Sequence, residues 1–288
     1  MNHKLSLGFS PCPNDTYMFD AMVHAKINTE ELEFDVVMED VEVLNQRAMH
    51  GKLDVTKISF AAFTKVTDKY SLLNSGSALG NGVGPLLIAK DNSPLLWRGV
   101  GGEAVAIPGK STTANFLFSI YFPEAKNKVE MLFSEIESAV LSEKVDAGVI
   151  IHESRFTYGQ KGLKKICDLG ELWEKETNQP IPLGGIAVRR NLPEEVQQKL
   201  NRVMRRSVEF AFANPDSSYG YVKLYAQEMD EEVRRKHIAL YVNDFSISLG
   251  EKGRRAIEIF FQRALKAGMI SSVPENIFMN QAGELSAR

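Results

Sequence analysis

Short apolar segments alternate with longer helical patterns along almost the whole chain. Segments such as 4–9, 34–39 and 104–107 are rich in aliphatic and aromatic residues and end at polar turns. Between them, for example at 41–50 and 134–142, apolar residues recur with the helical period. This alternation is typical of an α/β protein in which helices connect largely parallel strands.

The chain of 288 residues is long enough for two units, and two segments mark the expected boundaries. Asp91–Pro94 precedes a new series of predicted strands, and Asn178–Gly185 is rich in proline and glycine. We therefore expect a larger, discontinuous lobe formed by residues 1–91 and 186–288, with a smaller lobe, 92–185, inserted between them. Two lobes joined by two crossings form a cleft, which is a preferred place for a ligand.

Charge and cysteine content argue against several classes of function. The net charge of -3 provides no excess of Lys and Arg, so we expect neither nucleic acid nor a membrane surface as a partner. Cys12 and Cys167 match no metal-ligand spacing and no disulfide framework, which favours a reducing compartment. The first residues lack the apolar core of a secretory signal, and no run approaches the roughly 20 apolar residues of a spanning helix. We therefore expect a cytoplasmic protein.

Three predicted strand-to-helix turns carry small polar side chains, and two of them also carry a lysine. They are Ser10–Asp15, Lys57–Ser59 and Lys110–Thr113. Free backbone amides and the positive end of the helix dipole make such turns suitable for an anion. Ordinary N-capping explains any single turn equally well. The three together predict a small carboxylate or similar anion between the lobes, with Asn14 and Asp15 among its contacts.

The apolar run 147–151 is followed directly by a histidine, His152. The end of a strand in an open α/β sheet faces the ligand crevice, and an imidazole with a pKa near its ordinary value of about 6.5 suits proton abstraction there. A hydrogen-bonded structural histidine is the other interpretation. No second histidine follows at the zinc-protease spacing, so we expect no metal site of that type. The remaining internal histidines, His24, His50 and His237, are interpreted as ordinary helix residues.

Residues on either side of these motifs have two interpretations each. Cys12 precedes a predicted helix, whose N-terminus can lower the pKa of a thiol, but no partner base is in view for a nucleophile. Glu153 and Arg155 can orient His152 or contact a substrate, although ion pairs on a helix surface explain them equally well.

Five motifs occur in order along the first two thirds of the chain. They are Ser10–Thr16, Asp54–Ser59, Gly80–Pro85, Ser111–Ala114 and Gly148–Glu153. In this combination the chain resembles the 1,4-dihydroxy-6-naphthoate synthases of the futalosine route to menaquinone, from the first predicted strand to about Arg190. Each motif alone is weak, whereas the ordered set is specific.

The resemblance implies a fold like that of the type 2 periplasmic solute-binding proteins, used here for catalysis. It implies a lyase that converts cyclic dehypoxanthine futalosine to 1,4-dihydroxy-6-naphthoate and dihydroxyacetone, with His152 at the position of the proton acceptor and without metal or other cofactor. The implied substrate contacts are Lys57, Ile58, Ser59, Thr112 and Thr113, with Thr113 and Ala114 as the alternative for the last pair. A partly flat carboxylate substrate also suits the predicted anion turns.

Two rival functions stay open. A solute-binding receptor for a small carboxylate is the usual role of such a two-lobe fold, but these receptors are normally exported and need no base at His152. The second rival is the chorismate dehydratase of the same pathway, on the same fold. The segments Ser10–Asp15 and Ile150–Glu153 favour the naphthoate synthase.

Overall fold

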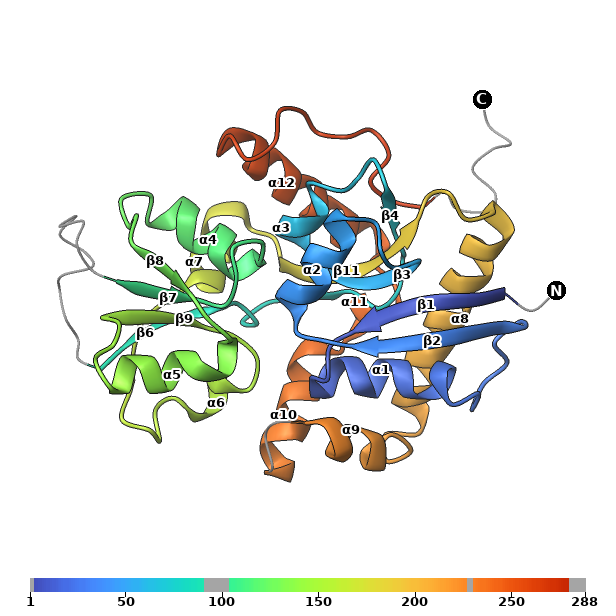
Figure 1. Cartoon of the computed structure of the whole chain (residues 1–288), viewed down its shortest axis with the longest axis horizontal. Helices are drawn as coiled ribbons and strands as arrows, with labels where there is room; N and C mark the ends of the chain where they lie inside the picture. The colour runs from blue at the N-terminus through green and yellow to red at the C-terminus, as the bar shows by residue number, and fades with distance from the viewer. Residues whose placement is uncertain (1–2, 91–103, 227–229, 280–288) are drawn as a thin grey trace.

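The computed structural model describes residues 3–90, 104–226 and 230–279, which form two lobes (Figure 1). Each lobe is built around one β-sheet, so the expected α/β class and two-lobe architecture are confirmed. The expectation of largely parallel sheets is wrong, because both sheets are mixed. The chain enters the second sheet through a strand that is antiparallel to its neighbours. It returns to the first sheet through another antiparallel strand.

The first lobe contains a six-stranded sheet with the order β2-β1-β3-β11-β4, and β5 also pairs with β11. Its parallel part is connected by two helices that follow the predicted pattern. The elements are β1 (His3–Phe9), α1 (Pro13–Val23), β2 (Leu32–Met38), α2 (Val41–Met49), β3 (Val55–Ser59), α3 (Phe60–Phe63), β4 (Tyr70–Leu72), β5 (Ala78–Gly80) and β11 (Ile181–Arg189). The two short strands β4 and β5 both pair with β11.

The second lobe contains a five-stranded sheet with the order β10-β6-β9-β7-β8. Its elements are β6 (Leu86–Ala89), β7 (Val105–Ile107), α4 (Thr113–Tyr121), β8 (Lys128–Glu130), α5 (Phe133–Leu141), β9 (Ala147–Ile150), α6 (Ser154–Thr157), β10 (Lys164–Asp168) and α7 (Leu169–Thr177). We did not predict β10, because its two lysines and one aspartate leave too few apolar residues for the alternating pattern of a strand.

The chain passes from one sheet to the other at positions that differ from the expected lobe boundaries. Residues 91–94, where we expected the first boundary, lie outside the described residues, but β6 has already joined the second sheet before them. The second expected boundary, residue 186, lies inside β11, which pairs in the first sheet from Ile181 onward. An apolar run such as β6 indicates a buried strand but carries no information about which sheet it joins.

The C-terminal helices cover the first lobe. They are α8 (Glu194–Ala213), α9 (Tyr219–Tyr225), α10 (Glu231–Tyr241), α11 (Asp244–Ile247) and α12 (Gly250–Lys266). Helices α8, α9 and α10 pack on α1, whereas α12 packs on α3 and β11 (Figure 1). Residues 227–229, which follow α9 closely, lie outside the described part of the chain. Helix α10 lies at the junction between the lobes (Figure 1).

An apolar core continues from one lobe to the other through Phe260 of α12. Its ring lies 6.2 Å from that of Phe60 in the first lobe. It also lies 4.4 Å from Phe116 on α4 and 5.8 Å from Trp173 on α7, both in the second lobe. All four rings are buried, so the hydrophobic effect stabilises the orientation of the lobes in addition to the two chain crossings.

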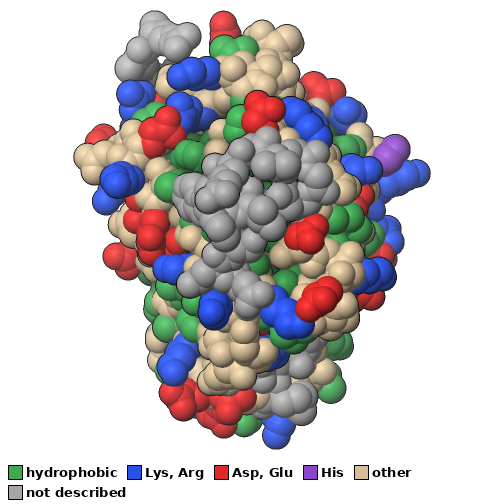
Figure 2. Space-filling view, turned by 90° about the vertical axis from the view of Figure 1, so that its left-hand side faces the viewer, with side chains coloured by type: hydrophobic (Ala, Val, Ile, Leu, Met, Phe, Trp, Pro, Cys, Tyr) green, Lys and Arg blue, Asp and Glu red, His purple; other side chains and the backbone are tan. Residues whose placement is uncertain are grey.

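The surface of the second lobe carries charges of both signs. Figure 2, which views the molecule from this side, shows basic and acidic side chains intermixed on the coloured part of the face. This distribution agrees with the small net charge of -3. Among the described helices, none combines the length and the apolar composition required to cross a bilayer.

Candidate functional site

A cavity of about 90 Å³ lies between the lobes and is lined by residues of both. Most of its lining is apolar, with a few polar groups, as in typical small-molecule sites. Its walls include most of the residues that the sequence predicted for the site. These are Asn14, Lys57, Ile58, Ser59, Thr112, Thr113 and His152, together with Tyr241 of α10.

His152 lies two residues beyond the end of β9 in an unusual backbone conformation. Its φ is 57°, in the left-handed region that few residues other than glycine adopt. Such conformations cost free energy and cluster at functional sites. The turn places the imidazole in the cavity wall, where Nε2 lies 3.9 Å from Cys12 Sγ. The Phe133 ring packs against the imidazole at an angle of 63°, with the ring centroids 4.8 Å apart.

Burial lowers the pKa of His152 from 6.5 to about 4. The negative charge of Asp15 opposes this shift, and the positive charge of Lys57 adds to it. Our expectation of an ordinary pKa is therefore wrong, because the ring has lost most of its water. The imidazole is neutral at neutral pH and can accept a proton, although it is a weaker base than a solvated histidine.

A buried ion pair forms one wall of the site. Asp15 Oδ1 lies 2.9 Å from Lys57 Nζ and also accepts a hydrogen bond from Asn14 Nδ2 at 2.9 Å. Asp15 Oδ2 accepts hydrogen bonds from the hydroxyl and the backbone N–H of Ser10, at 2.7 and 3.2 Å. The described residues that line the cavity do not include Asp15, which lies behind Lys57. Its carboxylate holds the ammonium group of Lys57 at the cavity.

The ammonium group of Lys57 has a charge partner but unused hydrogen-bonding capacity. Its side chain is 8% exposed, yet Nζ makes no hydrogen bond of good geometry with any residue that the structure describes. A buried donor without an acceptor is costly. Because Lys57 lines the cavity, an anionic ligand there would supply the missing acceptor.

The turn after β3 keeps a hydroxyl group available. The backbone N–H of Ser59 donates to Asn45 Oδ1 at 2.9 Å, and Ser59 Oγ accepts from Asn45 Nδ2 at 3.1 Å. The side chain of Ser59 makes no capping bond to α3. The hydroxyl proton of Ser59 is therefore positioned for a ligand in the cavity.

The hydroxyl groups of the α4 turn are engaged within the protein. Thr112 Oγ1 caps the helix by accepting from Asn115 N at 3.2 Å, and it donates to Gly109 O at 2.8 Å. Thr113 Oγ1 donates to Leu183 O at 2.7 Å and accepts from Ala61 N at 3.3 Å, so it links α4 to both neighbouring segments. What this turn offers a ligand is the backbone at the helix N-terminus.

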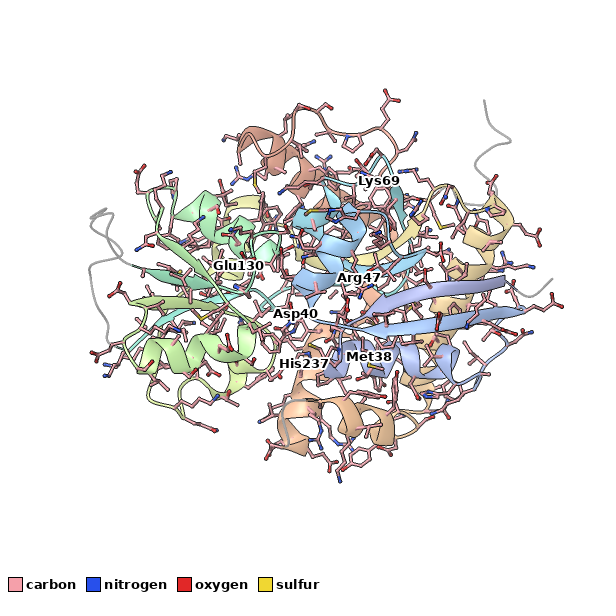
Figure 3. The ribbon with its side chains drawn as sticks, in the orientation of Figure 1. Met38, Asp40, Arg47, Lys69, Glu130 and His237 are labelled. Carbon is pink, nitrogen blue, oxygen red and sulfur yellow. The ribbon has the colours of Figure 1, made fainter. Side chains whose placement is uncertain are left out.

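His237 lies on a helix, as expected, but it is also part of the site. It is fully buried on α10, and Figure 3 labels it at the junction of the lobes. Its Nε2 lies 2.9 Å from Asn14 Oδ1 and its Nδ1 lies 3.6 Å from Glu153 Oε2. Burial, with smaller effects of His152 and Lys57, lowers its pKa well below 6.5.

The helical period contains a signal for His237 that we did not use. Arg234, His237 and Tyr241 recur at spacings of three and four and are the buried residues of α10. A histidine on the buried stripe of a helix is a candidate for a specific contact. The sequence alone does not show that the contact is His152, which lies in another lobe.

Two other sequence interpretations are now decided. Burial, followed by the charge of Glu153, raises the pKa of the Cys12 thiol well above 9, so the expectation that the helix N-terminus lowers it is wrong. Arg155 donates to Gly84 O and pairs with Asp168, with Nη2 2.6 Å from Oδ2. This pairing corresponds to the ion-pair interpretation of Arg155 rather than to a substrate contact.

Searches against solved structures agree with the architecture. A crystal structure of a protein from Archaeoglobus fulgidus is 38% identical, with a TM-score of 0.87, and the match covers 93% of this chain and 99% of that one. The ligand-binding component of an ABC-type import system from Staphylococcus aureus matches with a TM-score of 0.71 at 12% identity, over 99% of both chains. An alkanesulfonate-binding protein from Xanthomonas axonopodis matches with 0.68 at 12% identity, over 96% of both. These likenesses confirm the periplasmic-binding-protein type of fold.

Sequence comparisons identify the family. A protein from Thermus thermophilus named 1,4-dihydroxy-6-naphtoate synthase is 44% identical over 275 residues, which is 96% of this chain and 99% of that protein. A protein of the same name from Streptomyces coelicolor is 41% identical over 274 residues, covering 93% and 95%. The sequence model of the family described as menaquinone biosynthesis matches residues 5–266. The chain therefore belongs to the menaquinone biosynthesis family.

Proposed function

We propose that this protein is a lyase that converts cyclic dehypoxanthine futalosine to 1,4-dihydroxy-6-naphthoate and dihydroxyacetone, with His152 as the general base. The likeness to two proteins named naphthoate synthase supports the reaction, at 44% and 41% identity over nearly the full length. The observation that carries the role of His152 is its position, since a neutral imidazole lines the cavity between the lobes.

Lys57 and Ser59 bind the carboxylate of the substrate in this proposal. Lys57 Nζ has hydrogen-bonding capacity that its ion pair with Asp15 does not use, and the hydroxyl of Ser59 is directed by Asn45. A charge-assisted hydrogen bond of this kind contributes about 1.5–3 kcal/mol. The apolar walls, which include Ile58 and Leu183, then contact the flat part of the substrate.

His152 removes the proton in this proposal, after which a carbon–carbon bond breaks and the aromatic ring is completed. Abstraction requires the reacting group within roughly 3 Å of a ring nitrogen. A bound carboxylate also favours the imidazolium that forms, because a nearby negative charge raises the pKa of a histidine. The substrate itself therefore strengthens a base whose pKa is about 4 in the free protein.

The test is an assay of the purified protein with cyclic dehypoxanthine futalosine, with the products identified by mass. The variant to compare is His152→Asn, because asparagine tolerates the left-handed backbone of this position better than alanine does. Naphthoate from the wild type and none from the variant is the expected result. A variant with near-normal kcat would remove His152 from the mechanism.

The same assay separates the enzyme from a receptor. If the wild type forms no product but binds small carboxylates tightly, the protein shares the function as well as the fold of the solute-binding proteins. His24→Gln serves as the matched control, since His24 directly follows the end of α1 and its side chain is 46% exposed. This control is expected to leave turnover unchanged.

A further inference from the structure

Behind His152, a histidine nitrogen with a free lone pair faces a carboxyl oxygen. Asn14 uses its Nδ2 to donate to Asp15, so its Oδ1 faces His237 Nε2 at 2.9 Å. An amide oxygen can only accept, and therefore Nε2 of His237 carries the proton. Burial keeps this imidazole neutral, because it lowers the pKa of His237 well below 6.5. Its Nδ1 consequently presents a lone pair.

The lone pair of His237 points at Glu153. Nδ1 receives no hydrogen bond from any described residue and lies 3.6 Å from Glu153 Oε2. Two groups that both offer electron pairs stabilise each other only when a proton or a metal cation lies between them. Zinc bonds of about 2.0–2.2 Å in a tetrahedral site separate nitrogen and oxygen ligands by roughly 3.4 Å. The observed separation is close to that value.

His152 completes a group of three potential ligands. One donor atom from each of His152, Glu153 and His237 lies within 4.8 Å of the other two. Both imidazoles are neutral at neutral pH, which is the form that binds metals. His152 lines the cavity, so an ion has a route to the group. Two imidazoles and one carboxylate are a typical ligand set for zinc.

We propose that His152, His237 and Glu153 form a binding site for a divalent transition-metal ion of the zinc type, and that the bound ion blocks His152. The blocking rests on the proposed function, whereas the binding does not. Lys57 and Asp15 form an ion pair nearby, so their charges largely offset each other at the site. Magnesium prefers oxygen ligands in an octahedron and does not fit this group.

The rings reach this group from two lobes, which is why the sequence shows no metal motif. His152 and Glu153 follow β9, whereas His237 lies on α10 far along the chain. The rings of the two histidines are nearly parallel, 18° apart with centroids at 6.0 Å. A shared ion would therefore also tie the second lobe to the first.

Calorimetric titration of the full chain with ZnCl₂, after removal of metals by a chelator, tests the binding. The wild type is expected to bind one ion. His237→Gln keeps a donor near the position of Nε2 for Asn14 but removes Nδ1, and we expect a loss of affinity greater than about 100-fold. Glu153→Gln is the second variant, with a similar expected loss. Circular dichroism checks that both variants are folded.

His24→Gln is the matched control, because His24 also lies beside a carboxylate, with Nδ1 2.9 Å from Asp20 Oδ1. This variant is expected to retain the wild-type affinity and stoichiometry. Co²⁺ in place of Zn²⁺ gives an independent readout, since its visible absorption reports a tetrahedral site with nitrogen ligands. Absence of zinc binding by the wild type would mean that a proton occupies the contact, and it would overturn the proposal. Wild-type affinity in both ligand variants would overturn it as well.

Turnover measured across the same zinc titration tests the blocking. Loss of turnover in step with occupancy supports it, and full turnover with the site occupied overturns that part. If zinc binds but the protein forms no naphthoate even without metal, the metal site stands and the proposed function fails.

Discussion

Replacing Asp15 by asparagine tests whether the buried ion pair organises the cavity. The two side chains are 1% and 8% exposed, and their charged atoms lie 2.9 Å apart. Asparagine removes the charge that compensates Lys57. Its amide nitrogen also faces existing donors in either orientation, because Ser10 donates to one oxygen of Asp15 and Asn14 to the other.

The expected destabilisation is large. Removal of one partner of a buried ion pair costs about 3–5 kcal/mol, because an uncompensated charge is left inside the protein. For a chain of this size, each kcal/mol lowers Tm by about 2–4 °C. Asp15→Asn is therefore expected to lower Tm by about 6–20 °C. Lys57→Met is expected to lower it less, since Asp15 keeps its three hydrogen-bond donors.

Differential scanning calorimetry of the two single variants and the double variant measures the coupling. The double variant is expected to be more stable than the sum of the single effects predicts, by about 1–3 kcal/mol. Substrate binding should rank the variants differently, because Lys57→Met loses the ligand contact directly despite its smaller loss of stability. A loss below 1 kcal/mol for Asp15→Asn, or strict additivity in the double variant, would refute the reasoning.

Four further predictions concern His152, Ser59 and Thr112. Because the pKa of His152 is about 4 in the folded protein and 6.5 when unfolded, its contribution to stability is complete above pH 6.5 and is lost as the pH falls toward 4. Urea unfolding should show this loss to be about 2 kcal/mol larger in the wild type than in His152→Asn between pH 6.5 and 5, because His237 contributes its own loss to both proteins. For the same reason kcat/KM should stay level from pH 8 to about 5, and an inflection near 6.5 would contradict the burial of the ring. Ser59→Ala should weaken substrate binding about 10-fold to 150-fold in a titration, which corresponds to the loss of one charge-assisted hydrogen bond. Thr112→Val should lower the free energy of unfolding by about 1 kcal/mol, measured as a lower Tm, with little change in binding.

Periodicity and turn residues predicted the elements that build the cavity. The predicted helix after Asp40 begins there because the Asp40 carboxylate accepts from Glu42 N, a local interaction between neighbours in sequence. The three polar turns lie at the cavity for a similar reason, since the end of a strand and the start of a helix fix them locally. Local rules do not specify pairing between distant strands, and they therefore failed for β6, which joins the second sheet.

The chemical state of the site depends on burial, which the sequence does not report. From their local surroundings we expected a helix N-terminus that can lower the pKa of Cys12, and an ordinary pKa for His152. In the folded protein, burial raises the pKa of the thiol and lowers that of the imidazole, so both are neutral. His237 was missed because its partners, Asn14 and Glu153, lie far from it in sequence.

The two buried groups that the proposed reaction needs, Lys57 and His152, have different surroundings. Lys57 has Asp15 at 2.9 Å, so a cation is retained at the cavity with hydrogen-bonding capacity to spare. His152 has the Cys12 thiol at 3.9 Å and an aromatic ring, neither of which stabilises an imidazolium as a carboxylate would. The cavity therefore presents a charged group to bind an anion and a neutral group to accept a proton.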